Sequence, residues 1–235
     1  MRKQKYFLFV CFVVFFLTVA CFTTGSAQVS KSEMKESAIE EINSEYEEKI
    51  STEEEPIYEE DFSKYLTGEG VTMIGDSIIN GNRSLILEQF PYALIDAKGS
   101  RDVCGGFEAA TRLQAEGKLS DLVIVELGTN GPLLKHEPYA SGTQNLLELL
   151  GTERQIFWVT TYCSYSQWMA MNNEYIWELS YTRPNITVID WYSLAVQHPE
   201  WFPDGVHPNL AGARAFAKLL HDALEMKSPQ LEQTE

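Results

Sequence analysis

Residues 71–81 read VTMIGDSIING, and this stretch decides how the rest of the chain is interpreted. It opens with a short apolar run of the buried-strand type, passes through Gly75-Asp76-Ser77 and continues into a second apolar pair. The pattern predicts a strand that leads directly into a helix. Ser77 is therefore either the N-cap of that helix, a role that serine and aspartate both fill well, or a nucleophile displayed at the end of a strand.

Downstream of this stretch, apolar runs of strand length alternate with segments of helical spacing. The expected strands span residues 71–74, 92–97, 121–128, 155–161 and 185–191. The expected helices span residues 83–90, 107–119, 172–184 and 210–226, with one more helix ending near residue 150. Apolar strands that alternate with helices indicate a parallel sheet covered on both faces. The predicted fold class is therefore α/β, with a three-layer α/β/α domain.

Small, polar and titratable residues follow the ends of the expected strands. In an open parallel sheet the active site lies beyond the carboxyl ends of the strands, so these residues should converge on one edge. They are Gly75-Asp76-Ser77 after the first strand, residues 98–101 (KGSR) after the second, residues 128–131 (GTNG) after the third, residues 161–163 (TYC) after the fourth, and residues 204–208 (DGVHP) before the last helix.

This set contains the groups that acyl transfer requires: a nucleophile, a base, an acid that orients the base, and donors for an oxyanion. Ser77 can supply the hydroxyl, and His207 can accept its proton. Asp204 lies three residues before His207, close enough in a tight loop to hold the imidazole in the required tautomer. The donors can be the backbone N–H of Ser77, an N–H of the Gly99-Ser100 turn, and the side-chain amide of Asn130.

Each of these residues also has a structural interpretation. Ser77 alone is more often a helix cap than a nucleophile, Asn130 alone is a turn residue, and His207 alone is a surface histidine. The joint occurrence of GDS, GTNG and DGVHP, in this order and at strand ends, favours the catalytic interpretation.

The same blocks, as GDS, GTN and DxxH, resemble the SGNH (GDSL-like) hydrolase superfamily, and the resemblance extends over roughly residues 70–226. It implies a flavodoxin-like α/β/α fold around a parallel five-stranded sheet. It also implies that Ser77 is the nucleophile, His207 the base, Asp204 the supporting acid and Asn130 an oxyanion donor.

Longer runs are similar to the extracellular SGNH domain of peptidoglycan O-acetyltransferases of the acyltransferase-3 fused type. These runs are VTMIGDSI, IDAKGSRD, VIVELGTNG, VIDWYS and HPEWFPDGVHPN. The resemblance implies that the backbone N–H of Ser100 is an oxyanion donor, although Gly99 can fill the same role. The fused proteins carry a many-helix membrane domain, whereas this sequence has one apolar segment. We therefore expect either a separate membrane protein that supplies the acyl group or a free-standing esterase.

The composition limits the partners and cofactors. The 235 residues are 44% hydrophobic and 22% charged, which fits one globular domain with additional segments. The formal net charge is −16, so the surface repels phosphate backbones and nucleic acid is not expected as a partner. Two free thiols at Cys104 and Cys163 are preferred over a disulfide. The cysteines and histidines show no ligand spacing, so neither a metal nor another cofactor is expected.

Residues 1–27 are expected to be a signal peptide or a membrane anchor. Basic residues precede a continuous apolar run over residues 6–22, and small residues follow at Gly25 and Ala27. This is the pattern of a secretory signal, with cleavage after Ala27. The run is slightly short for a spanning helix of about 20 residues; an uncleaved anchor and a lipoprotein attached through Cys21 are the alternatives. Each route places the rest of the chain outside the cytoplasmic membrane, with membrane contact only through this segment.

Residues 28–66 are acidic and poor in large apolar side chains. Such a segment cannot bury enough apolar area to offset its ordering entropy, so it is predicted to be a disordered linker, with a docking site for a basic partner as the alternative. The catalytic domain is expected over residues 67–227 and a polar tail over residues 228–235.

Aromatic residues are frequent after the fourth and fifth strands, and aromatic faces beside a shallow cleft suit sugar rings, although core packing is the commoner role. Trp168, in a polar stretch, is the candidate for an exposed platform. Arg101 is a candidate ligand for a carboxylate on a glycan or a peptide stem, with a solvated or salt-bridged arginine as the alternative.

The sequence therefore predicts an extracytoplasmic serine enzyme that acts on O-acetyl groups of a cell-envelope glycan, as an esterase or an O-acetyltransferase. The expected substrate is a carbohydrate or a small acyl ester, and the acyl group passes through Ser77. A general GDSL-type esterase or lipase and a non-catalytic glycan-binding surface module are the alternatives.

Overall fold

A computed structural model describes residues 62–227 of the chain. Its strands are β1 (Val71–Gly75), β2 (Leu94–Ala97), β3 (Leu122–Glu126), β4 (Gln155–Val159) and β5 (Ile186–Ile189). They form one five-stranded sheet in the order β2-β1-β3-β4-β5, and every neighbouring pair is parallel. The predicted α/β class and parallel sheet are confirmed.

The central strands are buried along their whole length because both faces of the sheet are covered. Every residue of β1 and β3 is buried, as expected for strands whose sequences are continuous apolar runs. The register places Gly75, the last residue of β1, opposite Glu126, the last residue of β3. These two strands therefore end at the same level, and the segments that follow them leave the sheet side by side.

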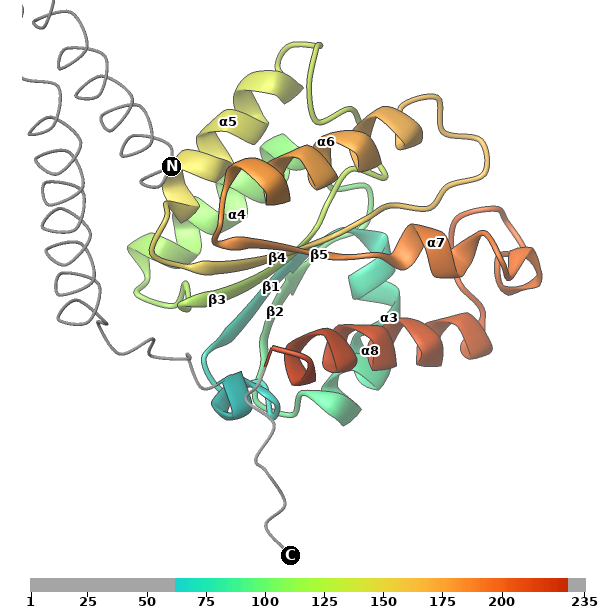
Figure 1. The fold of residues 1–235 in the computed structure, drawn as a ribbon, viewed down its shortest axis with the longest axis horizontal. Helices are drawn as coiled ribbons and strands as arrows, with labels where there is room; N and C mark the ends of the chain where they lie inside the picture. Colours follow the sequence, from blue (N-terminus) through green and yellow to red (C-terminus); the bar gives the residue numbers. More distant parts are fainter. Residues whose placement is uncertain (1–61, 228–235) are drawn as a thin grey trace, which may run out of the picture. The chain divides into compact units, whose positions relative to one another are not determined.

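Helices pack on both faces of the sheet (Figure 1). On one face lie α3 (Ser77–Gln89), the short α7 (Trp191–Ala195) and α8 (Leu210–Glu225). On the other face lie α4 (Val103–Ala115), α5 (Tyr139–Leu150) and α6 (Met169–Thr182). Each face has its own apolar core, which confirms the three-layer arrangement.

Helix starts differ most from the sequence expectation, because caps that the periodicity does not reveal set them. Helix α3 begins at Ser77, directly after the turn that follows β1, as the GDS stretch predicts, although the helical spacing of the sequence starts only at residue 83. Helix α4 begins at Val103 rather than at residue 107. Asp102 caps α4 by accepting a hydrogen bond from the Gly105 N–H. Likewise Asp190 caps α7, so Trp191, expected at the end of a strand, is helical.

The folded part begins earlier than expected. Residues Phe62–Tyr65 form a 3-10 helix, and the Tyr65 side chain is buried in the core beside α3 and α8. The predicted linker therefore extends too far at residues 62–66, because the buried side chain of Tyr65 attaches this end of the segment to the core. The predictions for residues 1–61 and for the tail at 228–235 lie outside the described residues.

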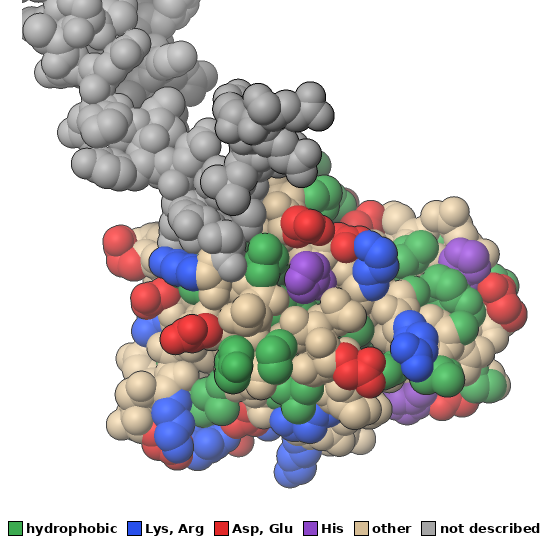
Figure 2. Space-filling model, turned by 90° about the horizontal axis from the view of Figure 1, so that it is seen from below, with side chains coloured by type: hydrophobic (Ala, Val, Ile, Leu, Met, Phe, Trp, Pro, Cys, Tyr) green, Lys and Arg blue, Asp and Glu red, His purple; other side chains and the backbone are tan. Residues whose placement is uncertain are grey.

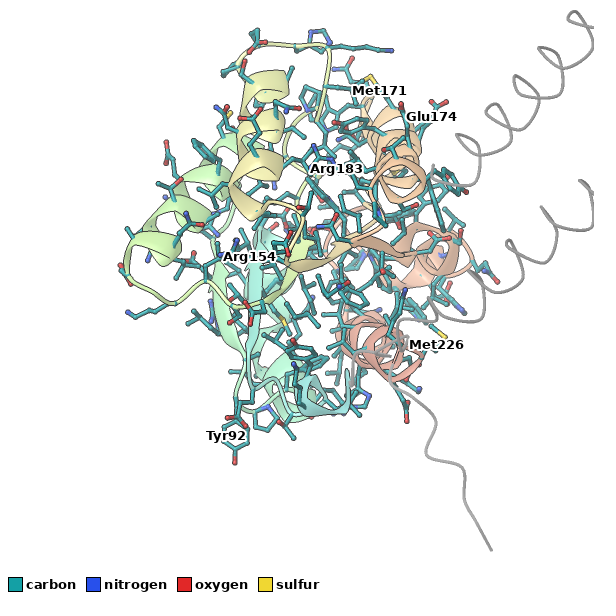
Figure 3. The ribbon with its side chains drawn as sticks, turned by 60° about the vertical axis from the view of Figure 1, so that its left-hand side comes forward. Tyr92, Arg154, Met171, Glu174, Arg183 and Met226 are labelled. Atoms are coloured by element: carbon teal, nitrogen blue, oxygen red, sulfur yellow. The ribbon has the colours of Figure 1, made fainter. Side chains whose placement is uncertain are left out.

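The surface of the domain is mixed in character. Acidic, basic and apolar side chains are interspersed on the face shown in Figure 2. Tyr92 points away from the domain at the amino end of β2, in keeping with its 72% exposure (Figure 3). Between residues 62 and 227, none of the helices has both the length and the apolar character that a membrane crossing requires.

Candidate active site

The nucleophile candidate lies in the turn between β1 and α3. Asp76 is the N-cap of α3, and its Oδ1 accepts a hydrogen bond of 2.8 Å from the Ile78 N–H. Ser77 is therefore the first helical residue and not the cap. The turn is tight, because a Cβ on Gly75 would lie 2.7 Å from Cδ1 of Ile79. With the capping role taken by Asp76, the half-buried Ser77 hydroxyl is left to face the site.

Ser77, His207 and Asp204 form a continuous hydrogen-bonded chain. The Ser77 Oγ lies 2.9 Å from His207 Nε2, and His207 Nδ1 lies 2.7 Å from Asp204 Oδ2. The structure thus brings together residues that are 130 positions apart in the sequence. In this arrangement Nε2 can accept the serine proton, while the carboxylate fixes Nδ1 as the protonated nitrogen.

The loop that carries the base is held by its own acid. Asp204 Oδ1 accepts hydrogen bonds from the backbone N–H groups of Val206 and His207, at 3.0 and 2.8 Å. Gly205 has a φ of 85°, a left-handed conformation that favours glycine. The hydrogen bond from His207 and the two backbone donors hold the pKa of Asp204 well below its usual range. The carboxylate therefore stays charged while it orients the imidazole.

The three predicted oxyanion donors belong to segments that meet near the start of α3. Ser77 is the first residue of α3, where a backbone N–H has no acceptor within the helix. The turn with Ser100 lies beside β1, because the Lys98 N–H donates to the Gly75 carbonyl oxygen. Asn130 Nδ2 donates to Asp76 Oδ2 at 2.8 Å, which fixes the amide next to the start of α3. The choice between Ser100 and Gly99 as a donor stays a prediction.

Known proteins resemble the chain in sequence and in fold. No family model matches the chain. A Bacillus subtilis protein, YrhL, that is named as a peptidoglycan O-acetyltransferase is 32% identical over 160 residues, which are 68% of this chain and 24% of the relative. The solved C-terminal catalytic domain of the Streptococcus pneumoniae peptidoglycan O-acetyltransferase OatA, with a methylsulfonyl adduct, superposes with a TM-score of 0.59 at 26% identity. That match covers 67% of this chain and 93% of the OatA domain.

The chain belongs to the SGNH hydrolase superfamily. A GDSL-like lipase from Bacteroides thetaiotaomicron shares the fold at 18% identity, with a TM-score of 0.52 over 66% of this chain and 87% of the lipase. The chain spans about a quarter of the length of the curated relatives it matches. The predicted membership of this superfamily is confirmed.

Two buried residues of this SGNH domain were not singled out from the sequence. Asn172 on α6 donates to the carbonyl oxygens of Gly128 and Gly131 and accepts from the Leu133 N–H, so it holds the loop that carries Asn130. Glu126, at the end of β3, is 3% exposed and accepts a hydrogen bond from the Asp76 N–H. A polar residue inside an apolar run, as in VIVEL, is the signal that marks Glu126.

The two substrate-binding candidates have structural partners. Arg101 binds the carbonyl oxygens of Gly75 and Asp96 and pairs with the Asp96 carboxylate at 2.7 Å. The structure therefore shows the alternative interpretation, a salt-bridged arginine. Its guanidinium connects the end of β2 to the end of β1. Trp168 is half-buried, and its Nε1 donates to the Thr129 carbonyl oxygen at 3.2 Å. This hydrogen bond supports the loop that carries Asn130, and the role of Trp168 as a platform for substrate stays a prediction.

Tyr165 presents a more exposed aromatic ring than Trp168. It is 70% exposed, and a Cβ on Gly205 would lie 3.3 Å from its ring, so it flanks the loop of Asp204 and His207. The neighbouring Cys163 side chain, desolvation and the negative charge of Asp204 raise the pKa of its hydroxyl. Sequence spacing alone did not separate Tyr165 from the other aromatic residues of this region.

The described residues contain two cysteines and a cluster of possible metal ligands outside the triad. Cys104 and Cys163 are free thiols. His221, Asp222 and Glu225 on α8 lie within ligand distance of one another. However, the Lys218 ammonium pairs with Asp222 at 2.6 Å, so a cation already occupies that carboxylate. His221 also contacts Phe90, at the opposite end of α3 from Ser77, and this group has no part in the acyl-transfer site.

Proposed function

We propose that the chain is an extracytoplasmic serine enzyme that acts on O-acetyl groups of a cell-envelope glycan, as an esterase or an O-acetyltransferase, through an acyl-Ser77 intermediate. The observation that carries the proposal is the hydrogen-bonded chain from Ser77 Oγ through His207 to Asp204. The names of the relatives, peptidoglycan O-acetyltransferases, support the substrate class and the location outside the membrane.

The first half-reaction transfers the acyl group to the enzyme. Ser77 Oγ attacks the acyl carbonyl carbon while His207 Nε2 takes its proton, and the carbonyl electron pair moves onto the oxygen. The Asn130 amide and the backbone N–H groups of Ser77 and of the Gly99-Ser100 turn stabilise this oxyanion. Collapse of the tetrahedral intermediate expels the alcohol, which receives the proton from His207.

The second half-reaction releases the acyl group. His207 removes a proton from an acceptor hydroxyl, the acceptor attacks the acyl carbon, and Ser77 leaves as its hydroxyl form. Water as acceptor gives an esterase, whereas a sugar hydroxyl held against the acyl-serine gives a transferase. In the transferase case a separate membrane protein supplies the acyl group. The triad is intact, so a binding module without catalysis is the weaker alternative.

Replacement of Ser77 tests the activity. With p-nitrophenyl acetate, Ser77→Ala should lower kcat/KM by at least about 10³-fold, because the remaining residues cannot form an acyl-enzyme. Ser84→Ala is a matched control, since Ser84 is an exposed serine on the same helix. Equal, slow hydrolysis by the wild type and Ser77→Ala would contradict an enzymatic function and would favour the alternative, a non-catalytic glycan-binding module.

A glycan acceptor distinguishes the transferase from the esterase. The purified domain is incubated with an acetyl donor ester and peptidoglycan fragments, and acetylated sugar is followed by mass spectrometry. Transferase activity produces acetylated glycan that is missing with Ser77→Ala. Release of acetate alone, with no acetylated sugar at saturating glycan, identifies an esterase.

A further inference from the structure

Two carboxyl groups lie buried against each other directly behind the nucleophile. Asp76 is fully buried and Glu126 is 3% exposed. The Asp76 N–H donates to Glu126 Oε2 at 3.2 Å, and the two side chains also lie within hydrogen-bonding reach of one another. Neither carboxyl group belongs to the triad of Ser77, His207 and Asp204, so the acyl-transfer steps do not account for the burial of Glu126.

The two carboxyl groups share a proton, because two adjacent buried carboxylates cannot both carry a charge. Asp76 accepts hydrogen bonds from the Ile78 N–H and from the Asn130 amide, both at 2.8 Å, and it lies at the amino end of α3. Donors and the helix dipole there stabilise a negative charge. Burial and the charge of Asp76 raise the pKa of Glu126 well above its usual range. The proton therefore resides on Glu126, which donates it to Asp76.

We propose that Glu126 is a positioning residue of the acyl-transfer site, which acts by clamping the Asp76 carboxylate that holds the Asn130 amide and starts α3 at Ser77. Through its oxygen it accepts the Asp76 N–H, and through its proton it binds the Asp76 side chain. Two of the three expected oxyanion donors, Asn130 and the Ser77 N–H, thus depend on one residue that touches no substrate. This inference rests on the proposed function, because it assigns a role within that site.

Among the groups that contact Glu126 in the described residues, Asp76 is the one that carries a charge. Helix α3 presents the backbone N–H of Ile79 to it, and the β3–α5 loop contributes Asn130, which does not titrate. Of the other ionisable groups nearby, Arg101 binds the Gly75 carbonyl oxygen one residue before Asp76. His207 and Asp204 contact each other and Ser77 rather than the pair.

This arrangement makes the site sensitive to alkaline pH. When Glu126 loses its proton, a second negative charge forms behind the oxyanion hole, and the clamp on Asp76 becomes a repulsion. The transition state carries a developing negative charge, whereas the bound substrate does not. Deprotonation should therefore lower kcat much more than it changes KM.

Two replacements of Glu126 separate its hydrogen bonds from its titration. Glu126→Gln keeps an acceptor for the Asp76 N–H and a donor for the Asp76 carboxylate, so kcat at neutral pH should stay near the wild-type value. Glu126→Met has similar volume but neither group, and kcat should fall by roughly 10- to 100-fold, on the scale of impaired oxyanion stabilisation, with KM much less changed. The loss of kcat in the wild type at alkaline pH should be absent from Glu126→Gln.

The following results would overturn the proposal: wild-type kcat in a folded Glu126→Met, an equal loss in Glu126→Gln and Glu126→Met, or the same alkaline profile in the wild type and Glu126→Gln. Circular dichroism establishes folding, and if Glu126→Met does not fold, the alkaline profile of Glu126→Gln decides. Infrared spectroscopy gives a readout without turnover, because the wild type should show the carbonyl stretch of a protonated buried carboxyl group that Glu126→Gln lacks. If the wild type hydrolyses the ester no faster than Ser77→Ala, the proposed function is refuted and this role of Glu126 with it. If the wild type is active but the Glu126 variants do not show the expected changes, only this inference is refuted.

Discussion

At the scale of single residues, the carboxyl group of Asp76 contacts the start of α3, Asn130 and Glu126. It caps α3 through Oδ1, holds Asn130 through Oδ2 and contacts the buried Glu126. The residue next to the nucleophile thus fixes where the helix starts and where the amide lies. The helix cap and the candidate nucleophile are two different residues. Asp76 caps the helix, so the Ser77 hydroxyl is not needed for capping and can act as the nucleophile.

Removal of the Asn130 amide should weaken catalysis more than binding. Asn130→Ala is expected to lower kcat by about 10²- to 10³-fold with a small change in KM, because in the proposed mechanism the amide contacts an oxyanion that forms only in the transition state. The measurement is steady-state hydrolysis of p-nitrophenyl acetate at several substrate concentrations. A rise in KM with an unchanged kcat would assign Asn130 to substrate binding instead. Thermal unfolding of the same variant controls for damage to the loop that Asn172 holds.

At the scale of helices and strands, the close packing of α4 against α5 depends on Gly142. A Cβ on Gly142 of α5 would lie 2.7 Å from Cys104 Sγ and 3.3 Å from Cys104 Cα on α4. The neighbouring backbone cannot move without displacing its helix from the sheet. Gly81 of α3 is different, because a Cβ there would meet nothing within 4 Å.

A pair of glycine replacements tests this packing. Gly142→Ala should lower the free energy of unfolding by about 1–3 kcal/mol through overpacking. Gly81→Ala is the matched control and should raise it by about 0.5–1 kcal/mol, because alanine is the better helix former where space is free. Urea unfolding followed by circular dichroism measures both. A neutral Gly142→Ala would show that the two helices separate at little cost.

The elements that the sequence predicts correctly are those with a strong apolar period. All five strands and the sheet class follow from apolar runs such as VIVEL, and the last helix follows from its amphipathic spacing. Caps such as Asp102, the short helix α7 and the burial of Tyr65 depend on tertiary contacts that leave little trace in a local window. The triad residues are identifiable because their motifs stand at strand ends, whereas the roles of Glu126 and Arg101 depend on contacts with Asp76 and Asp96 that only the folded structure shows.

At the scale of the whole molecule, the titration of Glu126 should make the free energy of unfolding depend on pH. Its pKa in the folded protein is raised above the ordinary value of 4.5, so the folded state binds its proton more tightly than the unfolded chain does. The stabilising contribution is fully present below the ordinary pKa and is lost as the pH rises through the raised pKa.

The comparison of wild type with Glu126→Gln isolates this contribution. As the pH rises from the ordinary pKa of Glu126 through its raised pKa, the free energy of unfolding of the wild type should fall relative to that of Glu126→Gln, by up to about 1.4 kcal/mol per pH unit. Urea titrations at a series of pH values measure the difference. A constant difference across the range would show that Glu126 has its ordinary pKa in the folded protein.

The side chains of Asp204 and His207 are about half exposed, at 53% and 50%, so the catalytic hydroxyl lies near the surface and not at the base of a deep pocket. A long polymer can therefore lie across this edge of the sheet with both of its ends far away. If the substrate is a glycan, as proposed, a site of this shape gives no advantage to chain termini. The sites of reaction would then be scattered along a strand and would not advance from one end.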